Sequence, residues 1–220
     1  MTSPDSDTEA EFVQFVCFRT DGPVPVDLFQ QSWIPFAEEF FARGIKTMIL
    51  SEKLPLSGDL SPYKFIAKSY WASITAVKLT FEKGLPSPSS KGHITASQGG
   101  IFKLVHTAKG ETNAKHNVIY KVGFKAFTMI PTLEESLTKE KVLDYADYLH
   151  GLKGFETLAV YKLHECSGPI KEWHYDWIIE AFYNSVSVTE ESILKDLINC
   201  PMVDKTWELS IHKDYIQMTA

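Results

Sequence analysis

Several features that mark particular classes of protein are missing from this sequence. Its 220 residues include only three cysteines, Cys17, Cys166 and Cys200, and none of them belongs to a CxxC pair. A disulfide framework or a zinc site is therefore not expected, and we predict three reduced thiols. The sequence also contains no Gly-rich phosphate loop, HExxH or GxSxG motif. This absence weakens the case for a nucleotide-dependent enzyme, a metalloenzyme or a serine hydrolase, and we expect neither a metal nor a cofactor.

Long hydrophobic runs and blocks of basic residues are absent as well. No apolar run approaches the roughly 20 residues needed to cross a bilayer. Residues 1–11 (MTSPDSDTEAE) lack the basic start and apolar core of a signal peptide. We therefore expect a cytoplasmic protein that is not bound to membranes. A net charge of −6 without a Lys/Arg block argues against nucleic acid as a partner.

The residues that are present indicate an ordinary globular core, because 44% of them are hydrophobic and 13% aromatic. Residues 1–10 lack periodicity and predict a disordered tail. Alternation and helical spacing predict the same order of elements in both halves of the chain. The first half has strands 12–19, 45–50, 63–71 and 101–106, with helices 26–43 and 74–83. The second half has strands 115–125, 155–163, 173–183 and 207–215, with helices beginning after Thr138 and Thr189. Residues 85–100, rich in Ser, Gly and Pro, predict a connector or a lid.

Landmarks of the two halves recur at a nearly constant separation of 106 to 112 residues. The pairs are Phe18 with Phe124, Gly44 with Gly154, Ser73 with Ser185, and His106 with His212. The third strands also match at every second residue: Tyr63, Phe65, Ala67, Ser69 and Trp71 correspond to Tyr175, Trp177, Ile179, Ala181 and Tyr183. We interpret residues 11–108 and 115–220 as two tandem ferredoxin-like β-α-β-β-α-β units of the α+β class.

A single unit of this kind covers one face of its sheet with helices and leaves the other face bare. A bare apolar sheet needs a partner. We therefore predict that the two units lay their open faces together as an intramolecular α/β-barrel. The expected result is one compact body, present as a monomer or a homodimer.

Three short segments resemble the dimeric α/β-barrel superfamily, and within it the stress-responsive A/B-barrel (Dabb) proteins, a family that includes olivetolic acid cyclase. The segments are 116–122 (HNVIYKV), 154–156 (GFE) and 200–203 (CPMV). The resemblance implies that His116 matches the histidine that opens the first strand of these cyclases. Their H-P-x-H segment falls on residues 200–203, where Pro201 is retained and both histidines are replaced. Their catalytic tyrosine falls on Leu197.

Histidine and tyrosine are the candidates for proton transfer and for holding an enolate oxygen. His116 is the first candidate base, with Tyr120 on the same face of its strand; alternatively, His116 is a solvated residue at a strand edge. His106 and His212 either face the barrel interior from both halves or lie at the core boundary. His174 and Asp176 are an alternative catalytic pair, or a solvent-facing polar pair.

Substrate binding is assigned to polar and aromatic residues on the strands and on one helix. These candidates are Gln14, Tyr63, Phe65, Trp71, Tyr145, Tyr175, Trp177 and Tyr183. Gln14 could orient a ligand carbonyl or lie at the interior seam, and Tyr145 could line a pocket or belong to the core. The leading prediction is a cofactor-independent cyclase, isomerase or lyase that acts on a hydrophobic polyketide-like or terpenoid molecule in secondary metabolism. The alternatives are a non-catalytic stress-response binding protein and a cofactor-free monooxygenase.

Overall fold

The computed structural model describes residues 12–20, 31, 34, 38–56, 61–82, 94–110, 123–131, 139–166 and 174–219. Its first half contains β1 (Phe12–Thr20), β2 (Ile45–Lys53), β3 (Phe65–Trp71), α2 (Ile74–Glu82) and β4 (Ile94–Lys109). Its second half contains β5 (Gly123–Pro131), α3 (Lys139–His150), β6 (Phe155–Cys166), β7 (Tyr175–Asn184), α4 (Glu190–Ile198) and β8 (Glu208–Thr219).

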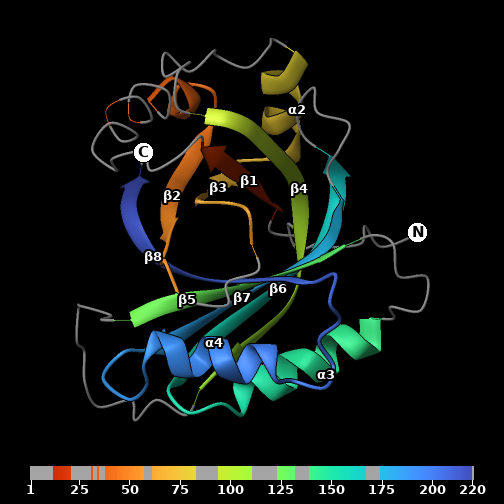
Figure 1. Ribbon diagram of the computed structural model, residues 1–220. Helices are drawn as coiled ribbons and strands as arrows, with labels where there is room; N and C mark the ends of the chain where they lie inside the picture. Colours follow the sequence, from red (N-terminus) through yellow and green to blue (C-terminus); the bar gives the residue numbers. More distant parts are fainter. Residues whose placement is uncertain are drawn as a thin grey trace, which may run out of the picture.

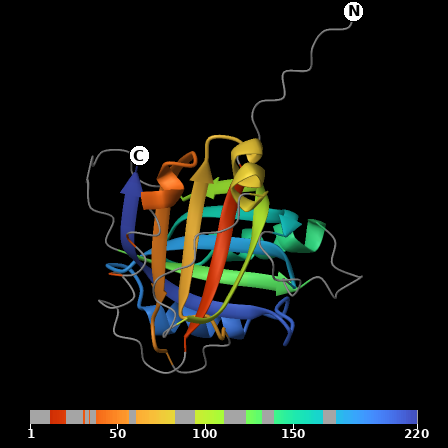
Figure 2. The same cartoon turned by 90° about the horizontal axis from the view of Figure 1, so that it is seen from above.

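The strands close into a barrel with the order β1-β3-β2-β8-β5-β7-β6-β4, and the neighbouring pairs are antiparallel. Helices α3 and α4 lie outside the barrel against β6, β8 and β5, and α2 lies outside against β3 (Figure 1). In Figure 2 the strands β1, β2 and β3 run across β5, β6 and β7, while the C-terminal part of β8 runs beside β2. The predicted α+β class and the barrel are therefore confirmed.

The pairing register of the strands shows which residues of the two halves are equivalent, and it corrects the sequence landmarks. The strand order is β4-β1-β3-β2 in the first half and β8-β5-β7-β6 in the second. Val13 in β1 pairs with Tyr70 in β3, and Lys125 in β5 pairs with Phe182 in β7. Each residue of the second pair lies 112 residues after its equivalent in the first pair. Phe18 therefore does not correspond to Phe124, and the predicted pairing of these two residues is wrong.

The counterpart of His212 also differs from the prediction. His212 pairs with Lys125 in β5, and the equivalent pair in the first half is Phe102 with Val13. Phe102, and not His106, therefore occupies the position that corresponds to His212.

Two predicted strand boundaries need correction. Residues 115–122 lie outside the described residues, and the first strand of the second half runs from Gly123 to Pro131. Strand β4 begins at Ile94, within the segment predicted to be a loop. The glycines predicted to end helices, Gly44 and Gly154, have φ values of 105° and 79°. A side chain would be strained at these angles, and each glycine is followed directly by a strand.

Buried residues separate into layers on the two faces of the sheet. Side chains such as Phe65, Trp71 and Val77 pack in a core between the first half and its helical segments. Trp177, Tyr183 and Leu194 belong to the corresponding core of the second half. The intervening positions of the strands point inward and fill part of the barrel. This inner cluster comprises Val13, Phe15, Cys17, Tyr63, Ile66, Phe102, Phe127, Met129, Tyr161, Tyr175 and Ile178.

Candidate functional site

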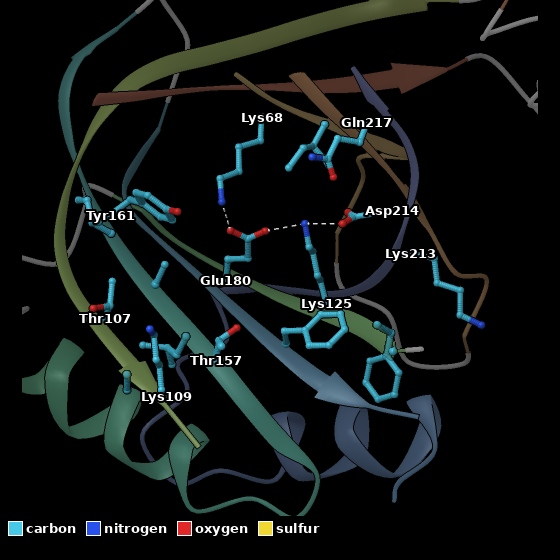
Figure 3. A pocket seen from close by; sticks show the side chains of 18 of the residues that line it. Lys68, Thr107, Lys109, Lys125, Thr157, Tyr161, Glu180, Lys213, Asp214 and Gln217 are labelled. Carbon is cyan, nitrogen blue, oxygen red and sulfur yellow. Dashed lines mark hydrogen bonds and ion pairs between the residues drawn. The ribbon is translucent and has the colours of Figure 1, made fainter. Parts of the chain in front are cut away.

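A cavity of about 820 Å³ lies inside the barrel and opens at one end of it. This volume is within the range of pockets that bind small organic molecules. The lining comes from β2 to β8, with exposed Lys109, Lys213 and Gln217 at the rim. Six charged residues line it: Lys68, Lys109, Lys125, Lys213, Glu180 and Asp214 (Figure 3).

Four of these charged groups form a chain of ion pairs across the cavity (Figure 3). Lys68 Nζ contacts one oxygen of Glu180, and Lys125 Nζ lies 2.9 Å from the other oxygen. Lys125 Nζ also lies 2.8 Å from Asp214 Oδ2. Asp214 Oδ1 in turn accepts a hydrogen bond of 2.7 Å from the Ser51 hydroxyl. We call Lys68, Glu180, Lys125 and Asp214 the ion chain.

Burial makes the charges of the ion chain depend on one another. The side chains of Lys68, Glu180 and Lys125 are only 7%, 8% and 11% exposed. Burial alone would raise the pKa of Glu180, but the ammonium groups of Lys125 and Lys68 outweigh it and hold this pKa at about 2. Burial alone would lower the pKa of each lysine, but Glu180 reverses this effect and both pKa values lie above their ordinary value. The three groups are therefore charged at neutral pH.

Aromatic rings surround the ammonium group of Lys68. Its Nζ lies 5.0 Å from the ring centroid of Tyr70, 5.1 Å from that of Tyr161 and 5.9 Å from that of Phe15. Tyr70 and Tyr161 also line the cavity. A planar ligand bound here would therefore contact the aromatic rings of Tyr70 and Tyr161 as well as the positive charge of Lys68.

His212 lies in the interior wall beside the ion chain and is fully buried. Its Nε2 is 2.9 Å from Ser210 Oγ, and its ring packs edge-on against Phe127 at 5.0 Å. Burial is the main cause that lowers the pKa of His212 to about 3. Of the two placements considered for His212, the inward one is found, and its imidazole is neutral at physiological pH.

His106 is half-buried and is not among the residues that line the cavity. The register of β4 with β6 shifts between Leu104 and His106. Such a shift redirects the side chains that follow it. Thr107 and Lys109, which lie beyond the shift, line the cavity instead.

The remaining catalytic candidates lie elsewhere. His116 and Tyr120 fall outside the described residues, so their roles stay predictions. His174 is exposed and Asp176 is half-buried, and neither lines the cavity.

Most predicted substrate-binding residues lie on the helix-covered side of the sheet. Phe65, Trp71, Trp177 and Tyr183 belong to the two outer cores and do not line the cavity. These four residues alternate along β3 and β7 as predicted, but the chosen face is the outer one, and Tyr175 does not share the face of Trp177 as predicted.

Gln14 and Tyr145 are likewise on the helix side. Gln14 is 5% exposed, and its Oε1 accepts a hydrogen bond of 3.1 Å from Trp71 Nε1. Tyr145 is fully buried in the outer core, with its hydroxyl 3.0 Å from Thr128 Oγ1. Both side chains therefore have structural partners away from the cavity.

Tyr63 and Tyr175 do face the barrel interior, but they lie away from the cavity. Their ring centroids are 6.3 Å apart, and the Tyr175 hydroxyl donates a hydrogen bond to Glu208 Oε1. Burial is the largest cause that raises the pKa of both Tyr175 and Glu208. Cys17 Sγ lies 3.9 Å from Met129 Sδ in the same inner cluster.

Sequence reasoning missed the ion chain, although a signal for it exists. Lys68 is the only charged residue in the strand FIAKSYW, and Glu180 interrupts the apolar run that follows Asp176 in YDWIIEAFYN. They are 112 residues apart, the same separation that relates Tyr63 to Tyr175. An isolated charge in a buried strand requires a partner of opposite sign. The repeat could therefore have indicated that these two residues meet.

Within the described part of the chain, no three His, Cys, Asp or Glu side chains gather as a possible metal site. Among the helices of the same described residues, none has the length and apolar character needed to span a membrane.

Comparisons with known proteins relate the chain to others by structure. No protein-family model and no curated protein matches the sequence. An anthrone oxidase-like protein superimposes with a TM-score of 0.65 and 11% identity, over 96% of this chain and 94% of that one. A candidate monooxygenase from Fusobacterium nucleatum has a TM-score of 0.50 and 5% identity, over 96% and 95% of the two chains. A mutant chlorite dismutase from Candidatus Nitrospira defluvii has a TM-score of 0.49 and 11% identity, over 94% and 92%.

The chain shares a closed, antiparallel α+β barrel fold with the anthrone oxidase-like protein. Identities this low establish the fold alone. Neither the anthrone oxidase-like protein nor the candidate monooxygenase is named as a stress-responsive A/B-barrel protein, so these two matches give no support to the narrower resemblance or to a cyclase.

Proposed function

We propose that this protein is a cofactor-independent oxygenase that oxidises a small aromatic ketone whose oxygen becomes an anion when an activated methylene group loses a proton. The observation that carries this proposal is the pair of buried ammonium groups, Lys68 and Lys125, beside tyrosine rings in a cavity of about 820 Å³. Such an arrangement suits an aromatic molecule whose oxygen becomes an anion during the reaction.

The lysines would act by stabilising that anion. Fixed positive groups in a site that excludes water lower the free energy of a developing enolate or phenolate. Because Lys68 and Lys125 are already held by Glu180, they need little reorganisation when the negative charge appears. The rings of Tyr70 and Tyr161 would hold the flat faces of the substrate.

The reaction can be written for a ketone with an activated methylene group. Loss of one methylene proton to solvent gives an enolate, whose oxygen is held by the lysines. Dioxygen oxidises the carbanion carbon, a C–O bond forms, and protonation gives a hydroperoxide. Loss of water then leaves a carbonyl, so that R₂CH₂ and O₂ become R₂C=O and H₂O. One oxygen atom enters the product and the other enters water.

The structural comparison supports this choice of chemistry over the leading sequence-based prediction. The anthrone oxidase-like protein has a TM-score of 0.65, and oxidation of anthrone to anthraquinone is a reaction of the kind written above. A sequence identity of 11% establishes a shared fold but not a shared activity. The proposal therefore depends on the cavity.

Oxygen uptake with anthrone as the substrate tests the proposal. We expect one O₂ consumed for each anthraquinone formed, at a rate above that of anthrone alone in buffer. Lys68→Met and Lys125→Met should each lower kcat by at least about tenfold. Lys46→Met, which removes an exposed lysine outside the cavity, is the matched control. If the wild-type protein adds nothing to the spontaneous rate with anthrone, the proposed oxidation is wrong for this substrate class.

A cyclase, isomerase or lyase remains the second candidate, because an enolate held by Lys68 and Lys125 is also the intermediate that a carbon–carbon bond-forming cyclase needs. Such an enzyme would convert a polyketide-like or terpenoid substrate without consuming O₂. A non-catalytic binding protein would return the ligand unchanged. Mass spectrometry of the ligand after incubation separates the three.

We further propose that the halves are two ferredoxin-like units folded as one body. The order β4-β1-β3-β2 and its counterpart β8-β5-β7-β6 support this proposal. Cytoplasmic location and the choice between monomer and homodimer remain predictions.

A further inference from the structure

The ion chain ends in a carboxylate that is held much less firmly than the one at its centre. Glu180 is 8% exposed and contacts two ammonium groups. Asp214 is 39% exposed and contacts one ammonium group and the Ser51 hydroxyl. Moving the Asp214 carboxylate out of the ion chain therefore requires less free energy than moving the Glu180 carboxylate.

Glu180 cannot leave without depriving Lys68 of its carboxylate in the ion chain and leaving Lys125 with Asp214 alone. Removing one partner from a buried ion pair leaves an uncompensated charge, which is strongly unfavourable. Asp214 can turn toward water, because its side chain is already 39% exposed. Lys125 would then keep Glu180 at 2.9 Å and present a free N–H donor to the cavity, since an ammonium group has three.

We propose that Asp214 occupies, in the free protein, the place that an anionic oxygen of the ligand takes on Lys125, and that binding exchanges one for the other. This inference rests on the proposed function in two respects only: it concerns the same cavity, and it assumes an aromatic ligand. It identifies that ligand as an organic anion, a carboxylate or a phenolate on a planar frame.

Charge balance favours an anion over a neutral ligand. After the exchange, Lys68 and Lys125 again face two negative groups, Glu180 and the ligand. A neutral ligand that displaced Asp214 would leave one buried positive charge uncompensated. The rim adds the positive charges of Lys109 and Lys213, of which Lys213 is paired with Glu190 at 3.0 Å. Discrimination by ligand charge therefore follows from the ion chain itself.

Fluorescence titration with two probes on the same tricyclic frame tests the exchange. Anthracene-9-carboxylate carries the anionic oxygen, and 9-anthracenemethanol is its neutral counterpart. Asp214→Asn keeps the size of the side chain and removes the competing charge. Because charge-assisted hydrogen bonds are about twice as strong as neutral ones, we expect the carboxylate to bind about five- to tenfold more tightly to this variant. The alcohol should bind within about twofold of wild type.

Three further variants keep the test decisive. Glu39→Gln makes the same change in net charge at the exposed Arg43 pair and should leave both affinities unchanged. Lys125→Met should lose the preference for the carboxylate over the alcohol. Ser51→Ala removes the second anchor of Asp214 and should raise the affinity for the carboxylate about twofold.

The exchange is wrong if Asp214→Asn binds anthracene-9-carboxylate no more tightly than wild type, or if both probes gain affinity equally. Should Asp214→Asn fail to fold, an unchanged affinity in Ser51→Ala would overturn the proposal equally well. These experiments measure affinity, whereas the oxygenase proposal is tested by oxygen uptake. Failure of one therefore leaves the other standing.

Discussion

Glu180→Gln removes the central negative charge of the ion chain while keeping nearly the same volume. In the wild-type protein this carboxylate contacts Lys68 and Lys125, and all three side chains are at most 11% exposed. The variant leaves Lys125 with Asp214, but it leaves Lys68 with no carboxylate of the ion chain. We therefore expect a large loss of stability from one polar substitution.

The magnitude follows from the pKa of Glu180, which is about 2 in the folded protein against an ordinary value of 4.5. A tenfold change in an acid constant corresponds to about 1.4 kcal/mol, so the ionised carboxylate contributes about 3 kcal/mol at neutral pH. Because the folded pKa is the lower one, this contribution is present above about pH 4.5 and is lost as the pH falls toward 2. The raised pKa values of the two lysines express the same ion pairs and are not added to it.

Urea unfolding followed by tryptophan fluorescence measures the effect. We expect Glu180→Gln to lose about 3 kcal/mol at pH 7 and roughly 1.5 kcal/mol at pH 3. The double variant Lys68→Met, Glu180→Met replaces the central pair with apolar side chains and should recover most of the loss, because Lys125 keeps Asp214. A loss at pH 7 below about 1 kcal/mol, or an equal loss at the two pH values, would refute the reasoning.

Three further predictions concern residues outside the ion chain. The pKa of His212 is lowered to about 3, so below pH 6.5 the unfolded chain binds a proton at His212 that the folded protein does not bind. The free energy of unfolding of the wild-type protein should therefore fall by about 2 kcal/mol between pH 7.5 and pH 5. Urea unfolding of His212→Phe should lack this loss. Trp71→Phe removes the donor to Gln14 and should cost about 1 to 2 kcal/mol, with unchanged affinity for anthracene-9-carboxylate in the fluorescence titration. Tyr161→Leu should weaken both tricyclic probes severalfold in that titration, because ring contact does not depend on ligand charge.

Much of the fold could be predicted from the sequence because its elements alternate clearly or have recognisable ends. Thr189 was expected to begin a helix, and its side chain accepts a hydrogen bond from the Ser192 amide at the start of α4. Gly44 and Gly154 were expected to end helices, and both adopt positive φ. The barrel follows from the need of each bare sheet for a cover.

The end of the first strand of the second half was predicted too early, at residue 125 instead of Pro131, for a physical reason. The prediction relied on residues 116–124, where apolar or aromatic side chains recur at every second position from Val118 to Phe124. The strand that forms, β5, is buried at every position from Phe124 to Pro131, on both faces. Burial on both faces removes the alternation on which the prediction relied.

The choice of sheet face failed because aromatic residues occupy both faces. In β3, Phe65 and Trp71 pack toward the helix side, while Tyr70 faces the cavity. Composition alone does not distinguish these faces. The charge of Lys68 does distinguish them, but only once Glu180 is known to lie across the barrel, since an unpartnered lysine would be assigned to solvent.

The correspondence between the halves explains why a charged interior is possible at all. Lys68 and Glu180 occupy equivalent positions, as Phe15 pairs with Lys68 in β1 and β3 and Phe127 pairs with Glu180 in β5 and β7. In a barrel built from two identical chains, a residue at such a position would meet its own copy, and like charges would repel. One chain with two different halves can place a lysine against a glutamate there. Lys125 likewise lies in β5 at the register position that Val13 has in β1, so the buried network depends on the two halves not being alike.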